Sequence, residues 1–152
     1  DPFIKHNKKI KFDRKINNLR NLLKISDIIS INCTLTNSSK GMLNKSFLKK
    51  MKKNSILVNT SRGQIIDNLQ ILFKHMSENK NFCLGLDVLP EEPPSQKDPF
   101  IKKWKSNKFD GRLIINPHTA YYSQESYISM REKASENVLL FLKKKRIRNR
   151  VI

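Results

Sequence analysis

Four short apolar segments divide the chain, and polar or turn-forming residues bound each of them. They are IISIN (28–32), SILVN (55–59), FCLGLDV (82–88) and LIIN (113–116). Their apolar residues are consecutive instead of alternating with polar ones, which is typical of strands buried on both faces of a sheet. We therefore predict four strands at these positions, each covered on both sides.

Apolar residues with helical spacing lie between these strands. Apolar positions 47, 48 and 51 follow Ser46, and apolar positions 69, 72, 73 and 76 follow Asp67. Serine and aspartate are residue types that cap helix N-termini, so we expect helices to begin at both. Strands that alternate with helices predict βαβ units on a parallel sheet, which is an α/β fold.

The longest predicted helix lies in the segment SQESYISMREKASENVLLFLKKK, from residue 123 onward. Ser123 is its expected N-cap, Glu125 lies near the positive end of the helix dipole, and the lysines at 143–145 lie near its negative end. An apolar stripe runs along this helix from Tyr127 to Phe141.

A long charged segment, residues 90–111, separates the third and fourth predicted strands. It contains four prolines, and only Asp98–Trp104 has the pattern of a short helix. Its length is typical of a surface loop at a functional site rather than of a linker.

The composition suits one globular domain, with 152 residues, 38% of them hydrophobic and 29% charged. No apolar run is long enough to span a bilayer and no signal peptide is visible, so we expect no membrane association. The chain opens on Asp1 instead of methionine. We therefore expect it to be a piece of a longer protein.

The formal net charge of +18 allows two interpretations. It indicates either a surface for nucleic acid or another acidic partner, or a shell of solvated lysines. The basic residues are spread along the chain without interleaved stacking aromatics, which favours the solvated shell. Cys33 and Cys83 lie far apart and away from the histidines, so we expect buried thiols and no metal site.

Polar residues follow each predicted strand. Because the carboxyl ends of parallel strands share one edge of a sheet, where α/β domains bind ligands, these residues are expected to gather there. In chain order they are CTLTNSS (33–39), Thr60 to Arg62, Asp87 with Glu91 and Glu92, and His118.

These residue types suit chemistry on a carbonyl group. Arginine binds a carboxylate through two hydrogen bonds and polarises a neighbouring carbonyl oxygen. Histidine exchanges a proton near neutral pH, and a carboxylate beside it holds the ring in place. Each residue also has a plainer interpretation: Arg62 as a surface ion-pair residue, His118 and Asp87 as turn residues, and Glu91–Glu92 as a solvated acid pair. Their placement at one edge favours the site.

Three motifs carry a resemblance to a known family. LVNTSRGQIID, GLDVLPEEP and IINPHTAYYS resemble, in order and spacing, the signatures of the D-isomer-specific 2-hydroxyacid dehydrogenases. Within that family, INPHTAYYSQESYISMREKASENV is most similar to the C-terminal-binding proteins, which are transcriptional corepressors built on the dehydrogenase fold. The resemblance covers nearly the whole chain.

The resemblance implies roles for individual residues. Arg62 matches the substrate-binding arginine, Glu92 matches the carboxylate that pairs with the histidine, and His118 matches the general acid/base. Asp1 matches the acidic residue that binds the adenosine ribose. Tyr121 stands where vertebrate C-terminal-binding proteins carry tryptophan. The residues that the resemblance places around NAD are Asp1, Cys33, Thr34, Leu35, Thr36, Asn37, Ser38, Ser39, Thr60, Ser61, Arg62, Asp87, His118 and Tyr121.

The glycine-rich turn of a dinucleotide-binding domain is missing from this sequence. It has four glycines and no G-x-G-x-x-G motif. The resemblance therefore implies the latter half of a Rossmann-like, doubly wound NAD-binding domain over residues 1–122, and a helix and tail over residues 123–152 that pack toward an absent substrate domain. We expect this chain alone to bind NAD weakly or not at all.

Two functions follow from the resemblance. The first is an NAD(H)-binding corepressor with 2-oxo acid/2-hydroxy acid oxidoreductase chemistry, located in the nucleus, that forms a homodimer and recruits transcription factors through short peptide motifs. The alternative is a metabolic NAD-dependent D-2-hydroxyacid dehydrogenase of the cytoplasm without a nuclear role. Direct nucleic-acid binding ranks last.

Overall fold

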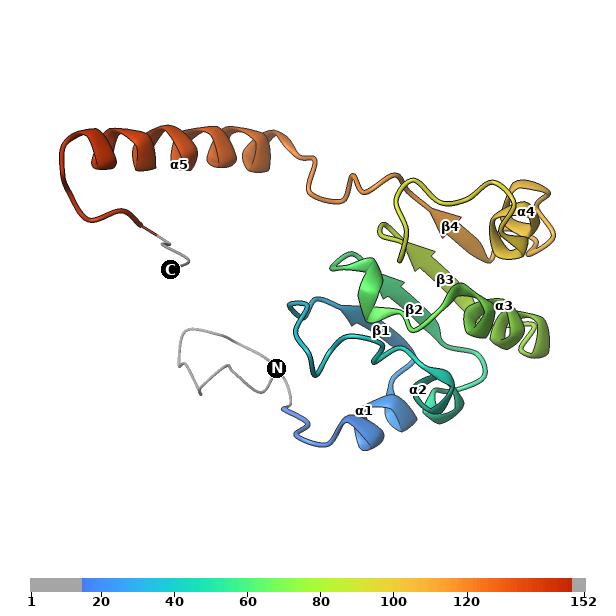
Figure 1. Cartoon of the computed structure of the whole chain (residues 1–152). Helices are drawn as coiled ribbons and strands as arrows, with labels where there is room; N and C mark the ends of the chain where they lie inside the picture. The colour runs from blue at the N-terminus through green and yellow to red at the C-terminus, as the bar shows by residue number, and fades with distance from the viewer. Residues whose placement is uncertain (1–14, 149–152) are drawn as a thin grey trace. The chain divides into compact units, whose positions relative to one another are not determined.

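The computed structural model describes residues 15–148, which fall into two compact units (Figure 1). The first unit extends to His118 and the second begins at Thr119. Asp1, the expected ribose-binding residue, lies outside the described residues. The division falls close to the expected domain boundary at residue 122, but the assignment of residues 123–152 to a second domain stays a prediction.

The first unit contains a parallel sheet of four strands (Figure 1). The strands lie in chain order, and residue pairs such as Ile28 with Ile56 and Leu84 with Leu113 fix their register. The predicted α/β fold with a Rossmann-like parallel sheet is thereby confirmed, and every strand end lies within two residues of the end of its predicted segment. The strands are β1 (Ile28–Ile31), β2 (Ile56–Asn59), β3 (Cys83–Leu86) and β4 (Leu113–Ile115).

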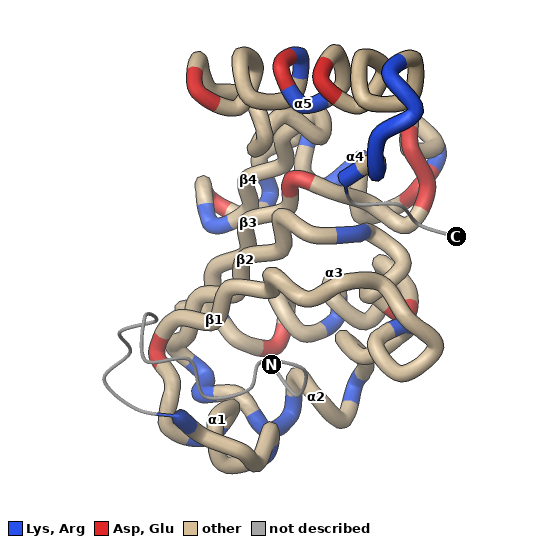
Figure 2. The backbone as a smooth tube through the Cα atoms, turned by 90° about the vertical axis from the view of Figure 1, so that its left-hand side faces the viewer, with Lys and Arg blue, Asp and Glu red and all other residues tan. Residues whose placement is uncertain are grey.

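Helices connect the strands. The helices of this unit are α1 (Leu19–Ile25), α2 (Lys45–Lys50), the 3₁₀ turn η1 (Gly63–Ile65), α3 (Leu69–Glu78) and α4 (Pro99–Lys105). Asp98 caps α4 by accepting from the backbone N–H of Phe100 at 2.7 Å, which agrees with the predicted helix in the long loop. Lys and Arg occur on every α-helix and in the loops, so the positive charge is diffuse (Figure 2).

Asparagine side chains cap the two helices for which we expected Ser46 and Asp67. The side-chain oxygen of Asn44 accepts from the N–H of Phe47 at 3.0 Å, and that of Asn68 accepts from the N–H of Ile71 at 3.1 Å. Both predicted caps are wrong, because an asparagine close to each predicted position reaches the third N–H of its helix. Ser46 lies inside the first turn of α2.

Only one face of the sheet is buried among the described residues. Ile29, Leu57 and Leu84 point into a core that also contains Leu48 of α2 and Leu72 of α3. On the opposite face Ile28 and Ile114 are 64% and 61% exposed. The prediction of strands buried on both faces is therefore wrong for the described chain, because successive side chains of a strand face opposite ways and helices cover one side only.

The second unit consists of α5 (Gln124–Leu142) and its flanking residues. The hydroxyl oxygen of Ser123 accepts from the N–H of Ser126 at 3.1 Å, so the predicted N-cap is confirmed. No residue of α5 is buried, and the apolar stripe that includes Tyr127 and Phe141 is exposed. No helix among residues 15–148 is both long and apolar enough to cross a membrane.

Candidate active site

Backbone hydrogen bonds continue past the ends of β2, β3 and β4 and hold the three strand exits together. The N–H of Asp87 donates to the carbonyl oxygen of Asn59 at 3.0 Å. The N–H of Asn116 donates to Leu86, and that of His118 donates to the carbonyl oxygen of Asp87, both at 2.9 Å. The residues that follow three different strands therefore lie at one edge of the sheet, as the sequence predicts.

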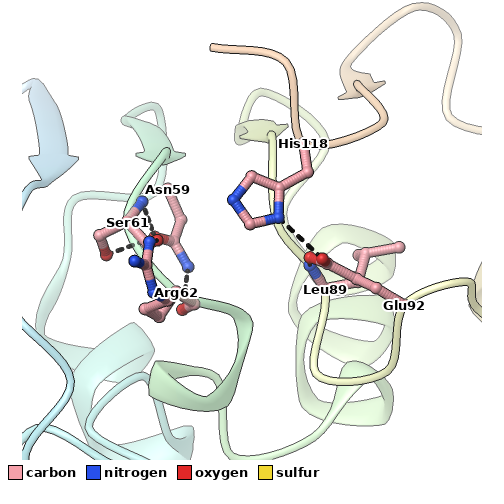
Figure 3. Close-up of polar contacts among 6 residues, drawn as sticks. All are labelled: Asn59, Ser61, Arg62, Leu89, Glu92 and His118. Atoms are coloured by element: carbon pink, nitrogen blue, oxygen red, sulfur yellow. Dashed lines mark hydrogen bonds and ion pairs between the residues drawn. The ribbon is translucent and has the colours of Figure 1, made fainter. Parts of the chain in front are cut away.

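Glu92 and His118 form a direct pair at this edge (Figure 3). Nδ1 of His118 lies 2.8 Å from Oε2 of Glu92. The other carboxylate oxygen, Oε1, accepts from the backbone N–H of Leu89, also at 2.8 Å. Both oxygens of Glu92 are thus engaged, which fixes the plane of the carboxylate and, through it, the imidazole ring.

The pKa of Glu92 favours the ionised carboxylate. Burial is the largest single influence and raises the pKa, and the charge of Asp87 acts in the same direction. The hydrogen bonds from Leu89 and His118, with the charge of His118, outweigh both and lower the pKa of Glu92 below its ordinary value of 4.5. An ionised carboxylate only accepts hydrogen bonds, so Nδ1 of His118 carries a proton.

The second ring nitrogen of His118 is left for other chemistry. Nε2 points away from Glu92, toward the side of the site where Arg62 lies (Figure 3). The side chain of His118 is 44% exposed, so solvent and small molecules reach it. Its backbone has φ +55°, the left-handed region that non-glycine residues rarely adopt and that clusters at functional sites.

Asn59 shapes the loop that carries Arg62 (Figure 3). Its fully buried side chain accepts from the N–H of Ser61 at 3.0 Å and from the Ser61 hydroxyl at 2.9 Å, and donates to the carbonyl oxygen of Arg62 at 3.1 Å. Nη1 of Arg62 donates to the carbonyl oxygen of Ser61 at 2.7 Å. Asn59 was not among the predicted site residues, although Asn-Thr-Ser at a strand end is a pattern in which asparagine bonds its own following backbone.

A pocket of about 410 Å³ opens at the exits of β1 and β2. Six residues expected around the cofactor line it, and Asn32 joins them without having been predicted. The lining offers hydroxyl and amide groups, one guanidinium and no carboxylate, which suits a polar ligand with an anionic group. The lining residues are Asn32, Cys33, Thr34, Leu35, Thr60, Ser61 and Arg62.

The other residues expected to contact the cofactor do not line this pocket. Ser39 is buried, and its hydroxyl donates to the carbonyl oxygen of Thr34 at 2.8 Å and accepts from the N–H of Thr36 at 2.8 Å, so it shapes the loop after β1. Asn37 and Ser38 are exposed on that loop. Tyr121 belongs to the second unit. The cofactor contacts expected of these residues stay predictions, and residues 15–148 contain no cluster of metal-binding side chains.

The fold and the site together define a class of protein, a Rossmann-like α/β domain with an arginine and a carboxylate–histidine pair at the carboxyl edge of its sheet. More particularly, the chain belongs to the D-isomer specific 2-hydroxyacid dehydrogenase family, whose NAD binding domain matches residues 1–120. The family part of the resemblance is thus confirmed. The polar lining of the pocket is compatible with the cofactor that the family's description names, NAD.

The chain is similar to curated reductases and dehydrogenases and to solved structures of the family. A glyoxylate reductase of Korarchaeum cryptofilum is 35% identical over 81% of this chain and 35% of its own length. A glycerate dehydrogenase of Methylorubrum extorquens is 32% identical over 82% of this chain and 38% of its own length. A D-isomer specific 2-hydroxyacid dehydrogenase from Lactobacillus delbrueckii ssp. bulgaricus, in its NAD complexed form, matches with a TM-score of 0.75 at 27% identity, over 90% of this chain and 43% of that one. The chain spans about a third of the length of the curated relatives it matches.

Proposed function

We propose that the protein to which this chain belongs is a metabolic NAD-dependent dehydrogenase that interconverts a small 2-oxo acid and its 2-hydroxy acid, in the D form where C2 is a stereocentre. The observation that carries the proposal is the Glu92–His118 pair, whose Nε2 is directed toward the side of the site where Arg62 lies. The relatives, a glyoxylate reductase and a glycerate dehydrogenase, support small 2-oxo acids such as glyoxylate and hydroxypyruvate as substrates.

The three side chains divide the work of the reaction. Arg62 binds the substrate carboxylate with its guanidinium and polarises the adjacent carbonyl. His118 donates the proton from Nε2 to the carbonyl oxygen as that oxygen becomes a hydroxyl, and takes it back in the oxidation direction. Glu92 holds the ring and stabilises the imidazolium. NADH, when bound, supplies the hydride that the carbonyl carbon receives.

The pocket at the exits of β1 and β2 is the part of this chain that would hold the cofactor. Thr34, Thr60 and Ser61 offer hydroxyl and backbone groups there, and Asn32 adds an amide. These groups orient a polar ligand at the same strand edge that carries Arg62, so that binding and proton transfer take place side by side.

A corepressor role is the second candidate, and it rests on the stretch from Ile115 to Val138 that is similar to the C-terminal-binding proteins. A corepressor would be a nuclear homodimer with transcription factors as partners, whereas the metabolic enzyme would be cytoplasmic. A pull-down of the intact protein with Pro-x-Asp-Leu-Ser peptides distinguishes the two. Specific capture supports the corepressor, and the absence of capture supports the metabolic enzyme.

The proposal is tested by assaying the intact protein with NADH and glyoxylate or hydroxypyruvate. We expect turnover, and we expect Arg62→Lys to raise KM by about tenfold or more, because lysine does not make the paired hydrogen bonds of a guanidinium. Arg20→Lys on the exposed surface of α1 is the matched control and leaves KM unchanged. Absence of NADH oxidation with every 2-oxo acid would overturn the proposal.

A further inference from the structure

Gly63 makes the closest approach between the loops that follow β2 and β3. A Cβ atom placed on this glycine would overlap the carbonyl carbon and oxygen of Leu89 and would lie 2.7 Å from the backbone nitrogen of Pro90. Real Cβ atoms do not come that close to other heavy atoms, and a backbone cannot swing away as a flexible side chain does. The φ angle of Gly63 is outside the left-handed region, so glycine is required here for space and not for conformation.

The two chain segments in this contact carry the reactive side chains. On one side, Gly63 directly follows Arg62 and begins the 3₁₀ turn η1. On the other side, the N–H of Leu89 donates to Glu92, and Glu92 pairs with His118. The Gly63–Leu89 contact is therefore the place where the arginine loop touches the support of the carboxylate–histidine pair.

We propose that Gly63 is a positioning residue, which sets the separation between Arg62 and the Glu92–His118 pair by letting the two loops pack backbone to backbone. The inference rests on the proposed function for its catalytic meaning. Its structural content, a mechanical link from residue 63 to Glu92, holds whatever the substrate is.

Asn59 gives this link its stiffness on the side of β2. Its side chain bonds Ser61 and the carbonyl group of Arg62, so the residues just before Gly63 have little freedom to absorb a displacement. Leu89 is 5% exposed and lies in the core, so the loop after β3 is held in place as well. A methyl group at residue 63 must therefore move one of the two loops as a body.

The test compares Gly63→Ala with Gly85→Ala in the intact protein. Gly85 lies in β3, and a Cβ there would meet only side-chain atoms of Val58 at 3.6 and 3.8 Å, which is ordinary contact. The readout is the pKa of Glu92, followed by NMR of its labelled carboxyl carbon. We expect Gly63→Ala to raise the pKa of Glu92, because the Leu89 N–H moves away from Oε1, and Gly85→Ala to leave it unchanged.

Activity gives a second readout. Because a misplacement of about 1 Å in an active site costs on the order of a hundredfold, Gly63→Ala should lower kcat/KM by about tenfold or more, while Gly85→Ala should not. A folded Gly63→Ala protein with the wild-type pKa of Glu92 would overturn the inference. That result is independent of turnover, so it is distinguishable from failure of the proposed function.

The same link can be tested from its other end if Gly63→Ala does not fold. Glu92→Ala removes the acceptor of the Leu89 N–H, so we expect the backbone at Leu89 to move. Because Leu89 contacts Gly63, the chemical shift of the Gly63 amide should then change in protein labelled at glycine. The amide of Gly85 is the internal reference and should hold its position. A Gly63 resonance that does not move would overturn the inference.

Discussion

Nδ1 of His118 lies 2.8 Å from Oε2 of Glu92, although 26 residues separate them in the chain. The pair forms because β3 and β4 are neighbours and His118 donates its backbone N–H to Asp87 at the end of β3. The sheet thus positions the backbone of the histidine, and the carboxylate positions its ring. Nε2, pointing away from the carboxylate, is the atom that this arrangement leaves for proton transfer.

Replacing Glu92 with glutamine tests the electrostatic part of this arrangement. The amide of Glu92→Gln is neutral and does not stabilise an imidazolium, so we expect kcat of the intact protein to fall by about 10- to 100-fold. The assay is the initial rate of NADH oxidation with a saturating 2-oxo acid. Glu91→Gln alters the neighbouring exposed carboxylate and should leave kcat unchanged; equal losses in both variants would contradict the role of Glu92.

Acid should remove the contribution of Glu92 to stability. The pKa of Glu92 is lowered in the folded chain from 4.5, so its stabilising contribution is present above that value and is lost as the pH falls through the lowered pKa. We expect wild type to be more stable than Glu92→Ala at about pH 6 and the difference to shrink at about pH 3. Urea unfolding at both pH values measures this, and a difference that stays constant would refute it.

His75 predicts a second pH effect, at a higher pH. Burial lowers the pKa of His75 from 6.5, against the opposing charge of Glu78, and its Nε2 is buried without a hydrogen-bond partner. His75 therefore binds a proton more readily in the unfolded chain than in the folded chain. The free energy of unfolding should thus decline as the pH falls from about 7 to about 5. His75→Leu, which keeps an apolar group against Phe82, should flatten this decline in thermal unfolding. A decline as steep as that of wild type would exclude His75 as its source.

Asn59 should matter for stability as well as for the site. Asn59→Ala removes a fully buried side chain and leaves the N–H of half-buried Ser61 and the carbonyl group of Arg62 without their partner, so we expect the free energy of unfolding to fall by about 1–3 kcal/mol. Asn17→Ala, at an exposed position before α1, is the control and should have a negligible effect. Urea unfolding of both variants measures these changes in the free energy of unfolding. Equal stability of Asn59→Ala and wild type would show that the loop is held by other contacts.

Local pattern was enough to predict the strands and most of the helices. The four apolar segments became β1 to β4, and each is short and bounded by polar or turn residues, which favours a strand over a helix. The sequence of those segments does not predict that only one face of the sheet is buried. Ile28 and Ile114 are exposed and Ile29 is buried, although all three are the same residue type. The caps at Asn44 and Asn68 were missed because neighbouring residues of the segment have similar capping preference.

The candidate site was predictable in its chemical groups and not in its supports. Arg62 and His118 stand just after β2 and β4, and parallel pairing brings such positions to one edge, while Glu92 follows in the loop after β3. The contact of Gly63 with Leu89 depends on how two loops approach in space, and no feature of the sequence near either residue shows it. The same holds for the bond from Leu89 to Glu92, which places the carboxylate.

The steady-state rate of the intact protein with His118 replaced by alanine tests the proposed proton transfer most directly. If Nε2 of His118 is the proton donor to the carbonyl oxygen, His118→Ala lowers kcat for 2-oxo acid reduction by about 10²- to 10⁴-fold. Unchanged turnover in a folded His118→Ala protein would contradict that role.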